Sequence, residues 1–449
     1  MECSFPKVQC GFRSDLASLE AKLVSCIKEC IFLRQLEAAL CVFSALTEGN
    51  EEGTMAAVQR VLAIVFTICG SSLGLAEDVT REIRIGQTLP YSGPLSGFGV
   101  IGRVQEAYFS KINAEGGING RKVKFISLDD AYSPPKTVEQ TRKLVEQDEV
   151  LLMFGSLGTA TNSAVRHYLN GKKIPQLFVL SGATKWADPR NFPWTMPGML
   201  AYETEGAIYA KHVLQTIPHA KIAILSQNDD FGRDYITGFK RALGTAAATM
   251  IVAEANYEIS APTISSQLAT LKASGANVLF GVTLGKFTSQ MIKGVAELSW
   301  KPDAFFVPTS ASSISFLEPA GLENAIGLVS SSNQKDAIDP QWANDTGVND
   351  FFAFMKQYLP GADLTNSNYA AGYHYAGLLV SVLLACGEDL GRENIMRQAA
   401  SLREVSLPLL LPGITVSTDT DDYLPFQQSR LRRFDGKSWI GFGNIQDDR

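Results

Sequence analysis

Cysteine is almost absent from most of the 449-residue chain. Six of the seven cysteines lie in the first 69 residues, and only Cys386 occurs in the remainder. The long carboxyl-terminal part therefore cannot form an internal disulfide, and its stability must come from a buried apolar core. Both cytosolic proteins and exported proteins with large cores can have so little cysteine, so the cysteine content does not indicate the compartment.

Strong charge of one sign and basic runs are also missing. Arginine and lysine number 40 against 46 acidic residues, which gives a net charge of -6 and a pI near 5.5. A nucleic-acid-binding surface needs clustered positive charge, so no nucleic acid is expected as a partner. With 45% hydrophobic and 19% charged residues, the composition is that of a soluble globular protein with room for two lobes.

Patterns typical of catalysis or metal binding are not found. The histidines lack the spacing of metal ligands, and neither a Gly-x-Ser-x-Gly turn nor a phosphate-binding P-loop occurs. Asp229 and Asp230 could act as paired carboxylates, but acids just after a strand commonly cap the next helix, which is the interpretation we favour. We therefore expect no enzyme activity, no cofactor and no metal site.

One glycine pattern matches the dinucleotide-binding fingerprint in spacing alone. Gly97, Gly99 and Gly102 have the G-x-G-x-x-G spacing, and Asp129 ends the next predicted strand. The fingerprint needs its first glycine directly at the end of a strand, whereas the preceding predicted strand ends at Leu89. We therefore expect a flexible glycine-rich loop at the edge of a cleft, and a dehydrogenase is only an alternative.

Residues 55–76 have the three parts of a signal peptide. A short segment with one positive charge precedes an apolar core at residues 61–73, and Gly74-Leu75-Ala76 fits a cleavage site. The core is shorter than the roughly 20 residues that span a bilayer, which disfavours a membrane anchor. Cys69 lacks the small preceding residue that lipidation requires. We expect export, with cleavage after Ala76.

Residues 1–54 precede the predicted signal peptide, which works only from an amino terminus. We therefore predict that translation starts at Met55 and that residues 1–54 are not part of the native protein. The alternative is a real amphipathic helix, because apolar residues recur there at helical spacing. They are Leu16, Leu19, Leu23, Ile27, Cys30 and Leu33.

From residue 83 onward, short β-rich runs alternate with helical stretches, as in a mostly parallel α/β sheet. The predicted strands are Ile83–Leu89, Val123–Leu128, Val150–Phe154, Gln176–Leu180, Lys221–Leu225, Val278–Phe280 and Ala304–Val307, with helices such as Thr137–Gln147 and Tyr202–Thr216 between them. A turn, helix and buried strand at residues 135–155 is echoed at residues 262–281. The pattern predicts an α/β fold with two doubly wound, Rossmann-like lobes and a cleft between them.

Two polar segments follow predicted strands at positions where a ligand would bind. They are Phe154-Gly-Ser-Leu-Gly-Thr159 and Leu180-Ser-Gly-Ala-Thr184. Glycine allows close approach of the backbone, and hydroxyls with the free N–H groups of a following helix form a cradle for an anion. Ser156, Thr159, Gly182 and Thr184 are therefore candidate ligand-binding residues. Aromatic residues near the strand ends would line an apolar pocket beside them, among them Phe98, Tyr202 and Phe231 together with Tyr91, Tyr132 and Trp186.

With these residues in view, the chain from residue 83 onward resembles the type I periplasmic solute-binding proteins of branched-chain amino acid ABC transporters. The resemblance rests on Gly86-x-x-x-Pro90-x-Ser-Gly-Pro94, Glu115-Gly-Gly-Ile-Asn-Gly-Arg121, Asp129-Asp130, Ser181-Gly-Ala-Thr184, Asp230-Phe-Gly232 and Arg433-Phe-Asp-Gly436. It implies two lobes joined by a three-crossover hinge, with residues 77–202 and 332–425 in lobe 1 and residues 203–331 and 426–449 in lobe 2. It also implies a monomeric periplasmic protein that delivers a small solute to a membrane permease.

The resemblance implies roles for individual residues. Thr159 and Thr184, with the backbone at Gly182, would hold a ligand carboxylate, and Phe98 and Phe231 would close over the ligand. Thr283 or Leu284 would face it from lobe 2.

One position departs from the family pattern. Amino-acid-binding members have a carboxylate for the ligand ammonium after the strand that ends at Val307, where this chain has Pro308-Thr309-Ser310. A buried ammonium without an anionic partner costs several kcal/mol, which favours a carboxylic acid without an α-amino group, aromatic in view of the pocket residues. A hydrophobic amino acid stays open if another acid replaces the missing partner. The candidates are Asp229, Asp230, Glu203 and Glu205.

The resulting prediction is a solute-binding component of an ABC transporter. A ligand-sensing protein of the same fold, which regulates a partner without transport, is the alternative from another class.

Overall fold

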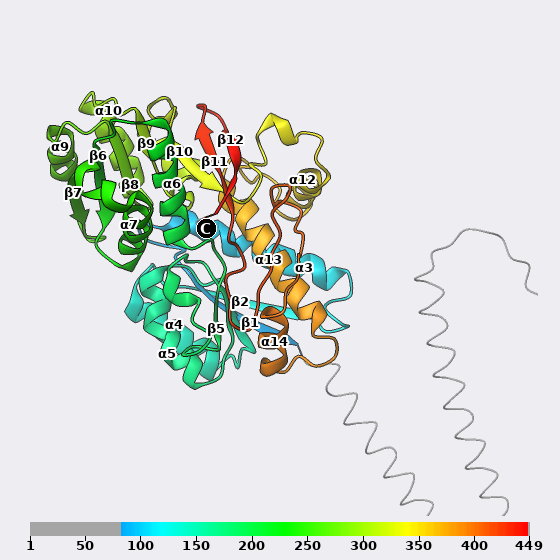
Figure 1. The fold of residues 1–449 in the computed structure, drawn as a ribbon. Coiled ribbons are helices and arrows are strands. Elements are labelled where there is room, and N and C mark those ends of the chain that lie inside the picture. The colour runs from blue at the N-terminus through cyan, green and yellow to red at the C-terminus, as the bar shows by residue number, and fades with distance from the viewer. Residues whose placement is uncertain (1–81, 448–449) are drawn as a thin grey trace, which may run out of the picture. The chain divides into compact units, whose positions relative to one another are not determined.

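Short, mostly buried runs between residues 83 and 197 form the first of two sheets in the computed structural model, which describes residues 82–447 (Figure 1). The five strands are parallel and have the order β2-β1-β3-β4-β5. They span Ile83–Leu89 (β1), Val123–Asp129 (β2), Leu152–Phe154 (β3), Gln176–Val179 (β4) and Thr195–Pro197 (β5). The central strands β3 and β4 are fully buried, as expected for parallel strands covered on both faces.

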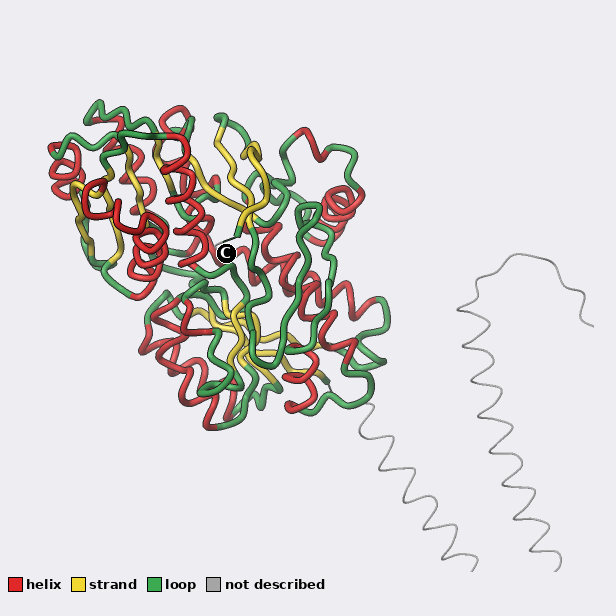
Figure 2. The backbone as a smooth tube through the Cα atoms, viewed as in Figure 1, coloured by secondary structure: helices red, strands yellow, loops and turns green. Residues whose placement is uncertain are grey.

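The second sheet has seven strands in the order β12-β11-β10-β9-β8-β6-β7. The strands are Ile222–Gln227 (β6), Ile251–Tyr257 (β7), Val278–Val282 (β8), Ala304–Phe306 (β9), Val329–Ser332 (β10), Ser429–Phe434 (β11) and Trp439–Gln446 (β12). The strands β6 to β10 pair in parallel, whereas β11 runs antiparallel to both β10 and β12. Figure 2 shows the strands of the two sheets as two separate yellow groups.

The two sheets repeat one topology. The order β2-β1-β3-β4-β5 of the first sheet has its counterpart in β7-β6-β8-β9-β10 of the second, to which β11 and β12 are added at one edge. The two predicted Rossmann-like lobes are therefore confirmed, and the sequence echo between residues 135–155 and 262–281 reflects this repeated topology. Gly281 lies inside β8 instead of ending the strand, unlike Gly155 after β3.

Helices connect the strands and pack against the sheets. They are Gly99–Ala114 (α3), Pro134–Glu146 (α4), Thr159–Gly171 (α5), Tyr202–Thr216 (α6), Asp230–Leu243 (α7), Ala247–Met250 (α8), Ser265–Ala273 (α9), Lys286–Glu297 (α10), Ile314–Leu317 (α11), Thr346–Tyr358 (α12), Ser367–Ala385 (α13) and Arg392–Ala399 (α14). Helices α6 and α7 pack along each other on the second sheet, and α13 packs along α3 on the first. Within residues 82–447, no helix has the length and apolarity needed to cross a membrane.

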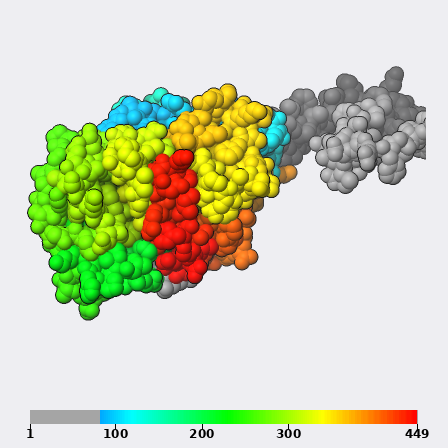
Figure 3. All heavy atoms as spheres, turned by 90° about the horizontal axis from the view of Figure 1, so that it is seen from above, coloured from blue at the N-terminus to red at the C-terminus, as the bar shows by residue number. Residues whose placement is uncertain are grey.

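The chain passes between the two lobes three times. It leaves the first sheet after β5, enters the second lobe with α6, and returns after β10 to form α12, α13 and α14 beside elements of the first lobe. It then joins the second sheet again through β11 and β12. In Figure 3 this last segment, coloured red, lies on the surface between the green and the yellow-to-orange parts of the chain.

Most predicted strands are found within two residues of their expected ends, and both named helices are found. Helix α6 has the predicted bounds, and α4 begins three residues earlier because Pro134 and Pro135 occupy its first turn, where proline is tolerated.

The prediction of a flexible loop at Gly97–Gly102 is wrong. Gly99 and Gly102 lie in the first turn of α3. Glycine is needed at position 102 because a side chain there would come within 2.0 Å of the Tyr91 hydroxyl. The predictions for residues 1–54 and 55–76 fall outside the described residues.

Candidate ligand-binding site

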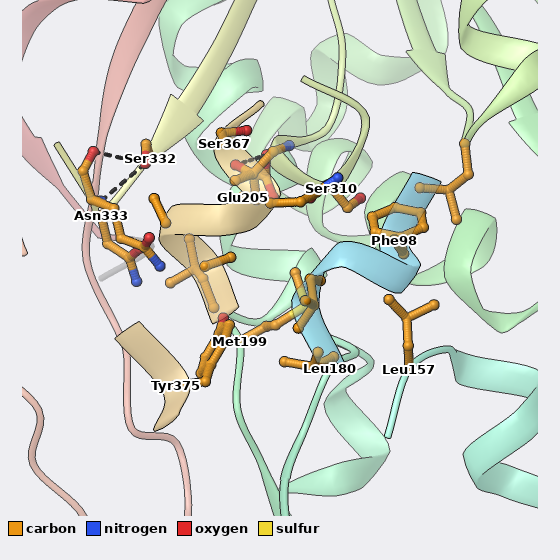
Figure 4. Close-up of a pocket in the computed structure, with 18 of the residues that line it drawn as sticks. Phe98, Leu157, Leu180, Met199, Glu205, Ser310, Ser332, Asn333, Ser367 and Tyr375 are labelled. Atoms are coloured by element: carbon orange, nitrogen blue, oxygen red, sulfur yellow. Dashed lines mark hydrogen bonds between the residues drawn. The ribbon is translucent and has the colours of Figure 1, made fainter. Parts of the chain in front are cut away.

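A cavity of about 130 Å³ lies between the two lobes, beyond the carboxyl ends of the parallel strands (Figure 4). This is the position at which open α/β sheets bind ligands. The apolar side chains Leu157, Leu180, Met199 and Tyr375 lie on one side in the close-up, and Glu205, Ser310, Ser332 and Ser367 lie on the other. The cavity is therefore divided into an apolar part and a polar part.

The first lobe contributes the start of helix α5. Gly158 precedes this helix with φ +106°, and a side chain there would meet the Tyr132 ring at 2.4 Å. Glycine thus allows the ring and the helix start to lie together at the cavity wall. The next residue, Thr159, is buried, and its hydroxyl lies 2.7 Å from that of Ser181. The amino end of α5, with its positive partial charge and free N–H groups, is suited to an anionic group.

Aromatic rings form the middle of the cavity. Tyr202 contacts Phe231 edge-on at 5.2 Å between ring centroids and stacks on Tyr235 at 4.6 Å. Phe98 from the first lobe packs against Phe316 of the second at 5.0 Å. Tyr202 and Phe231 are almost fully buried, and burial raises the pKa of Tyr202 to about 12. These rings give the cavity an apolar enclosure and connect the two lobes.

Glu205 supplies a carboxylate at the polar end. The side chain is 2% exposed, and Thr309 donates to Oε1 from its backbone N–H at 2.7 Å and its hydroxyl at 2.8 Å. The hydroxyls of Tyr209 and Tyr235 also donate to it. Burial raises the pKa of both tyrosines well above the ordinary value, so they remain protonated donors. Among the described residues, no lysine, arginine or histidine lies within 4.0 Å of Glu205.

Arg432 from β11 is the buried cation of the same region. It is 7% exposed, one of its terminal nitrogens donates to the Ser312 hydroxyl, and its guanidinium lies over the Trp439 ring. Burial lowers the pKa of the guanidinium, while Asp336 and Glu205 act in the opposite direction. Its Nε has no hydrogen-bond partner among the described residues.

The other three acids considered as ammonium partners lie outside the cavity wall. Asp229 caps α7 by accepting from the Gly232 N–H at 3.3 Å, as the structural interpretation predicts. Asp230 forms an ion pair with Lys185, and Glu203 forms one with Arg241. Glu205 is therefore the only one of the four that lines the cavity.

The nine predicted ligand-binding residues divide into two groups. Five line the cavity, namely Phe98, Thr159, Tyr202, Phe231 and Thr309. The other four contribute to its surroundings. The Ser156 hydroxyl accepts from the Thr88 N–H, and the Thr283 hydroxyl lies 3.0 Å from that of Thr288, whereas the neighbouring Leu284 lines the cavity.

Gly182 and Thr184 lie beside the cavity, and both form contacts between separate segments of the chain. Gly182 accepts from the Tyr202 N–H at 2.7 Å, and a side chain there would meet the Leu200 carbonyl oxygen at 2.2 Å. Thr184 donates to Asp234 of helix α7 from its N–H at 2.8 Å and from its hydroxyl at 3.1 Å. Together with the Lys185–Asp230 ion pair at 2.6 Å, these bonds join the first lobe to α7 of the second.

Several cavity residues were not among the sequence predictions. Helix α13 contributes Asn368, Ala371 and Tyr375, and β11 contributes Ser429 and Arg432. Helix α13 is buried on nearly all sides, so its sequence has no apolar stripe that would indicate which side faces a ligand. The described residues contain no group of three or more histidine, cysteine or acidic side chains that could hold a metal ion.

Comparisons with known proteins identify the same architecture. A family model described as "Periplasmic binding protein" matches residues 82–437. An "Amino acid binding protein" from Pseudomonas aeruginosa is 23% identical over 217 residues, which cover 47% of this chain and 56% of that protein. The chain thus spans just over half the length of the first curated relatives that it matches.

Two solved structures are similar over most of the chain. A branched chain amino acid ABC transporter protein from Thermus thermophilus with bound valine has a TM-score of 0.73 at 15% identity, covering 82% of this chain and 97% of that chain. A solute binding protein of an ABC transporter from Rhodopseudomonas palustris BisB5, in complex with 3,4-dihydroxy benzoic acid, has a TM-score of 0.70 at 19% identity, covering 82% and 98%. At these identities the likeness establishes the fold.

Proposed function

We propose that this chain, which belongs to the periplasmic binding protein family, captures a hydrophobic amino acid between its two lobes and delivers it to a membrane permease. The proposal includes the lobe ranges 77–202 with 332–425 and 203–331 with 426–449, a monomeric state, and export by the signal peptide at residues 55–76. It assigns no catalytic step to the chain. Regulation of a partner without transport is the competing proposal, and it predicts the same ligand.

The observation that carries the proposal is the buried carboxylate of Glu205. A buried charge is costly unless it is paired, and Glu205 has hydrogen-bond donors but no cation within 4.0 Å among the described residues. A ligand ammonium would supply that cation. Thr309, at the position where amino-acid-binding members of the family have a carboxylate, donates two hydrogen bonds to Glu205, so α6 supplies the acid instead of the segment after β9.

The rest of an amino acid would fit the remaining cavity wall. Its carboxylate would lie at the amino end of α5 beside Thr159, and its side chain would lie among Phe98, Tyr202 and Phe231. The volume of about 130 Å³ suits one small solute and is far too small for a dinucleotide. This volume counts against the dehydrogenase alternative.

A carboxylic acid without an amino group is the second candidate ligand. The aromatic rings in the cavity favour it, and one structural relative holds 3,4-dihydroxy benzoic acid. Such a ligand would gain nothing from Glu205, because two carboxylates near each other repel. The role of Glu205 therefore discriminates between the two ligand classes.

Titration calorimetry on E205Q tests the assignment. We expect a hydrophobic amino acid to bind the unaltered protein and to lose about 10²- to 10³-fold in affinity in E205Q, because a buried charge without its partner costs about 3–5 kcal/mol. The control E203Q makes the same charge change on the same helix but outside the cavity, and it should bind normally.

Two other results would contradict the amino-acid assignment. An aromatic acid that binds E205Q as well as or better than the unaltered protein would identify the second candidate. Equal loss of affinity in E203Q and E205Q would mean that the effect comes from helix charge and not from contact with the ligand.

A further inference from the structure

Three buried polar atoms in the wall of the cavity have no hydrogen-bond partner within residues 82–447. They are Nε of Arg432 and the hydroxyl oxygens of Ser429 and Ser310. Buried polar groups in folded proteins are almost always hydrogen-bonded, and an unpaired one destabilises the fold. Three of them in one cavity wall indicate a group that is bound there in the working protein.

These three residues lie in segments next to the carboxyl end of β10 in the second sheet. Ser310 lies in the short 3-10 helix Thr309–Ala311, which follows β9. Ser429 begins β11, whose next residue, Arg430, pairs with Ser332 at the carboxyl end of β10. Arg432 lies two residues further along β11, and its guanidinium donates to Ser312, just after the 3-10 helix. All three belong to the second lobe.

The chemistry of the three groups selects the kind of group that binds. A guanidinium Nε–H can only donate, and the two hydroxyls can donate as well, so together they require a hydrogen-bond acceptor. The two carboxylates that line the cavity already accept hydrogen bonds from other groups of the protein. Asp336 accepts from the Trp439 N–H at 2.8 Å, and Glu205 accepts from Thr309 and two tyrosines.

The charges of the cavity wall favour a neutral acceptor over a second anion. Glu205 and Asp336 are two acids that face the region, and Arg432 is the cation opposite them. Lys335 also lines the cavity, but its ammonium lies 2.8 Å from the Asp345 carboxylate, which neutralises it. A ligand carboxylate would meet two carboxylates and one guanidinium, whereas a carboxamide or hydroxyl oxygen would meet the donors without that repulsion.

We propose that Arg432, Ser429 and Ser310 form a specificity subsite for a neutral hydrogen-bond acceptor, such as a carboxamide or hydroxyl oxygen, at the polar end of the cavity near Glu205. This inference rests on the proposed function, because it concerns the same solute. It refines the ligand class from a purely apolar amino acid to one that carries a polar terminus. The subsite contacts the end of the ligand that points away from the amino end of α5.

Matched pairs of ligands test the subsite by calorimetry. Each pair shares its head group and body and differs in a terminal acceptor: leucine and asparagine, phenylalanine and tyrosine, benzoate and 4-hydroxybenzoate. Aspartate serves as the anionic counterpart of asparagine. In the pair that fits, we expect the member with the acceptor to bind about 10-fold or more tightly, since a hydrogen bond to a charged group is at stake. We expect aspartate to bind no more tightly than asparagine.

Variants assign the preference to named atoms. R432Q should remove the preference, whereas R433Q, an exposed neighbour with the same loss of charge, should keep it. S429A should reduce the preference without lowering the melting temperature of the free protein, because it removes an unpartnered buried hydroxyl. If R432Q fails to fold, S429A and S310A give the same test with little change in volume.

The outcomes separate the subsite from the proposed function. Equal or tighter binding of the apolar member in every pair that binds would overturn the subsite and leave the proposed function intact. A preference that survives S429A, S310A and R432Q would also overturn it, and would mean that these atoms hold only water. If no compound in the panel binds, the proposed function fails, and the subsite fails with it.

Discussion

Replacing Asp234 with alanine should shift the protein toward an open arrangement of its lobes. The Asp234 carboxylate on α7 accepts two hydrogen bonds from Thr184, which follows β4 in the first lobe. Close by, Lys185 pairs with Asp230 of the same helix. These polar contacts between lobes exist only when the lobes are together, so their loss weakens the closed state alone.

The structure indicates which of the two contacts contributes more. A hydrogen bond to a charged group contributes about 1.5–3 kcal/mol when buried. Asp234 is half-buried, and water competes for its carboxylate, so we take a value below that range, about 1–2 kcal/mol for its two bonds together. The Lys185 and Asp230 side chains are 31% and 41% exposed, and ion pairs this exposed contribute about 0–1 kcal/mol. D234A should therefore lower the ratio of closed to open protein about 5- to 30-fold, and D230A should lower it by a smaller factor.

Small-angle X-ray scattering and calorimetry measure the two consequences. D234A should have a larger radius of gyration without ligand than the unaltered protein, and a weaker apparent affinity, because the binding-competent state is less populated. D230A, one helical turn away on the same helix, is the matched control. A D234A variant with unchanged radius and affinity, or a larger effect of D230A, would refute the reasoning.

Three further predictions concern the described residues outside the polar contacts. His374 is buried with neither ring nitrogen partnered, and burial lowers its pKa from 6.5 to about 3. Its neutral form is therefore favoured in the fold, and stability falls as the pH drops below about 6.5; from pH 7 to 5 the unaltered protein should lose about 2 kcal/mol more than H374L in urea titrations. Equal losses would contradict this account. Burial raises the pKa of the Cys386 thiol to about 11, so peptide mass spectrometry should find it unmodified by iodoacetamide at pH 8 until the protein unfolds. Modification of the native protein would show that the thiol is accessible. In G182A, the new methyl group would meet Leu200 and Tyr202, and the melting curve should show a loss of about 1–3 kcal/mol with weaker ligand binding. An unchanged melting temperature would mean that Tyr202 moves freely.

The strands that could be predicted are those whose residue types by themselves indicate a buried strand. The run Ile83–Leu89 is apolar at both ends and contains the β-branched residues Ile83, Ile85 and Thr88, and the structure has β1 there without a shift. By contrast, β10 consists of one valine and three serines, a composition with little preference for a strand. It forms because β9 and β11 pair with it on both sides, which is a tertiary effect that no local pattern contains.

The polar end of the cavity shows the same limit. Thr159 and Phe231 could be placed from the sequence because each lies in the segment that follows a predicted strand, where ligands meet parallel sheets. Glu205 was one of four acids that sequence reasoning could not rank, since their distances to Thr309 depend on how α6 lies against the second sheet. Arg432 belongs to the last passage of the chain between the lobes, and only the pairing of β11 with β10 brings it to the cavity.

A crystal structure with the tightest-binding compound of the ligand panel tests the central claim most directly. The account predicts one ligand in the cavity between the lobes, with its ammonium on the Glu205 carboxylate and its carboxylate at Thr159. A ligand bound elsewhere, or one whose carboxylate faces Glu205, would contradict the account.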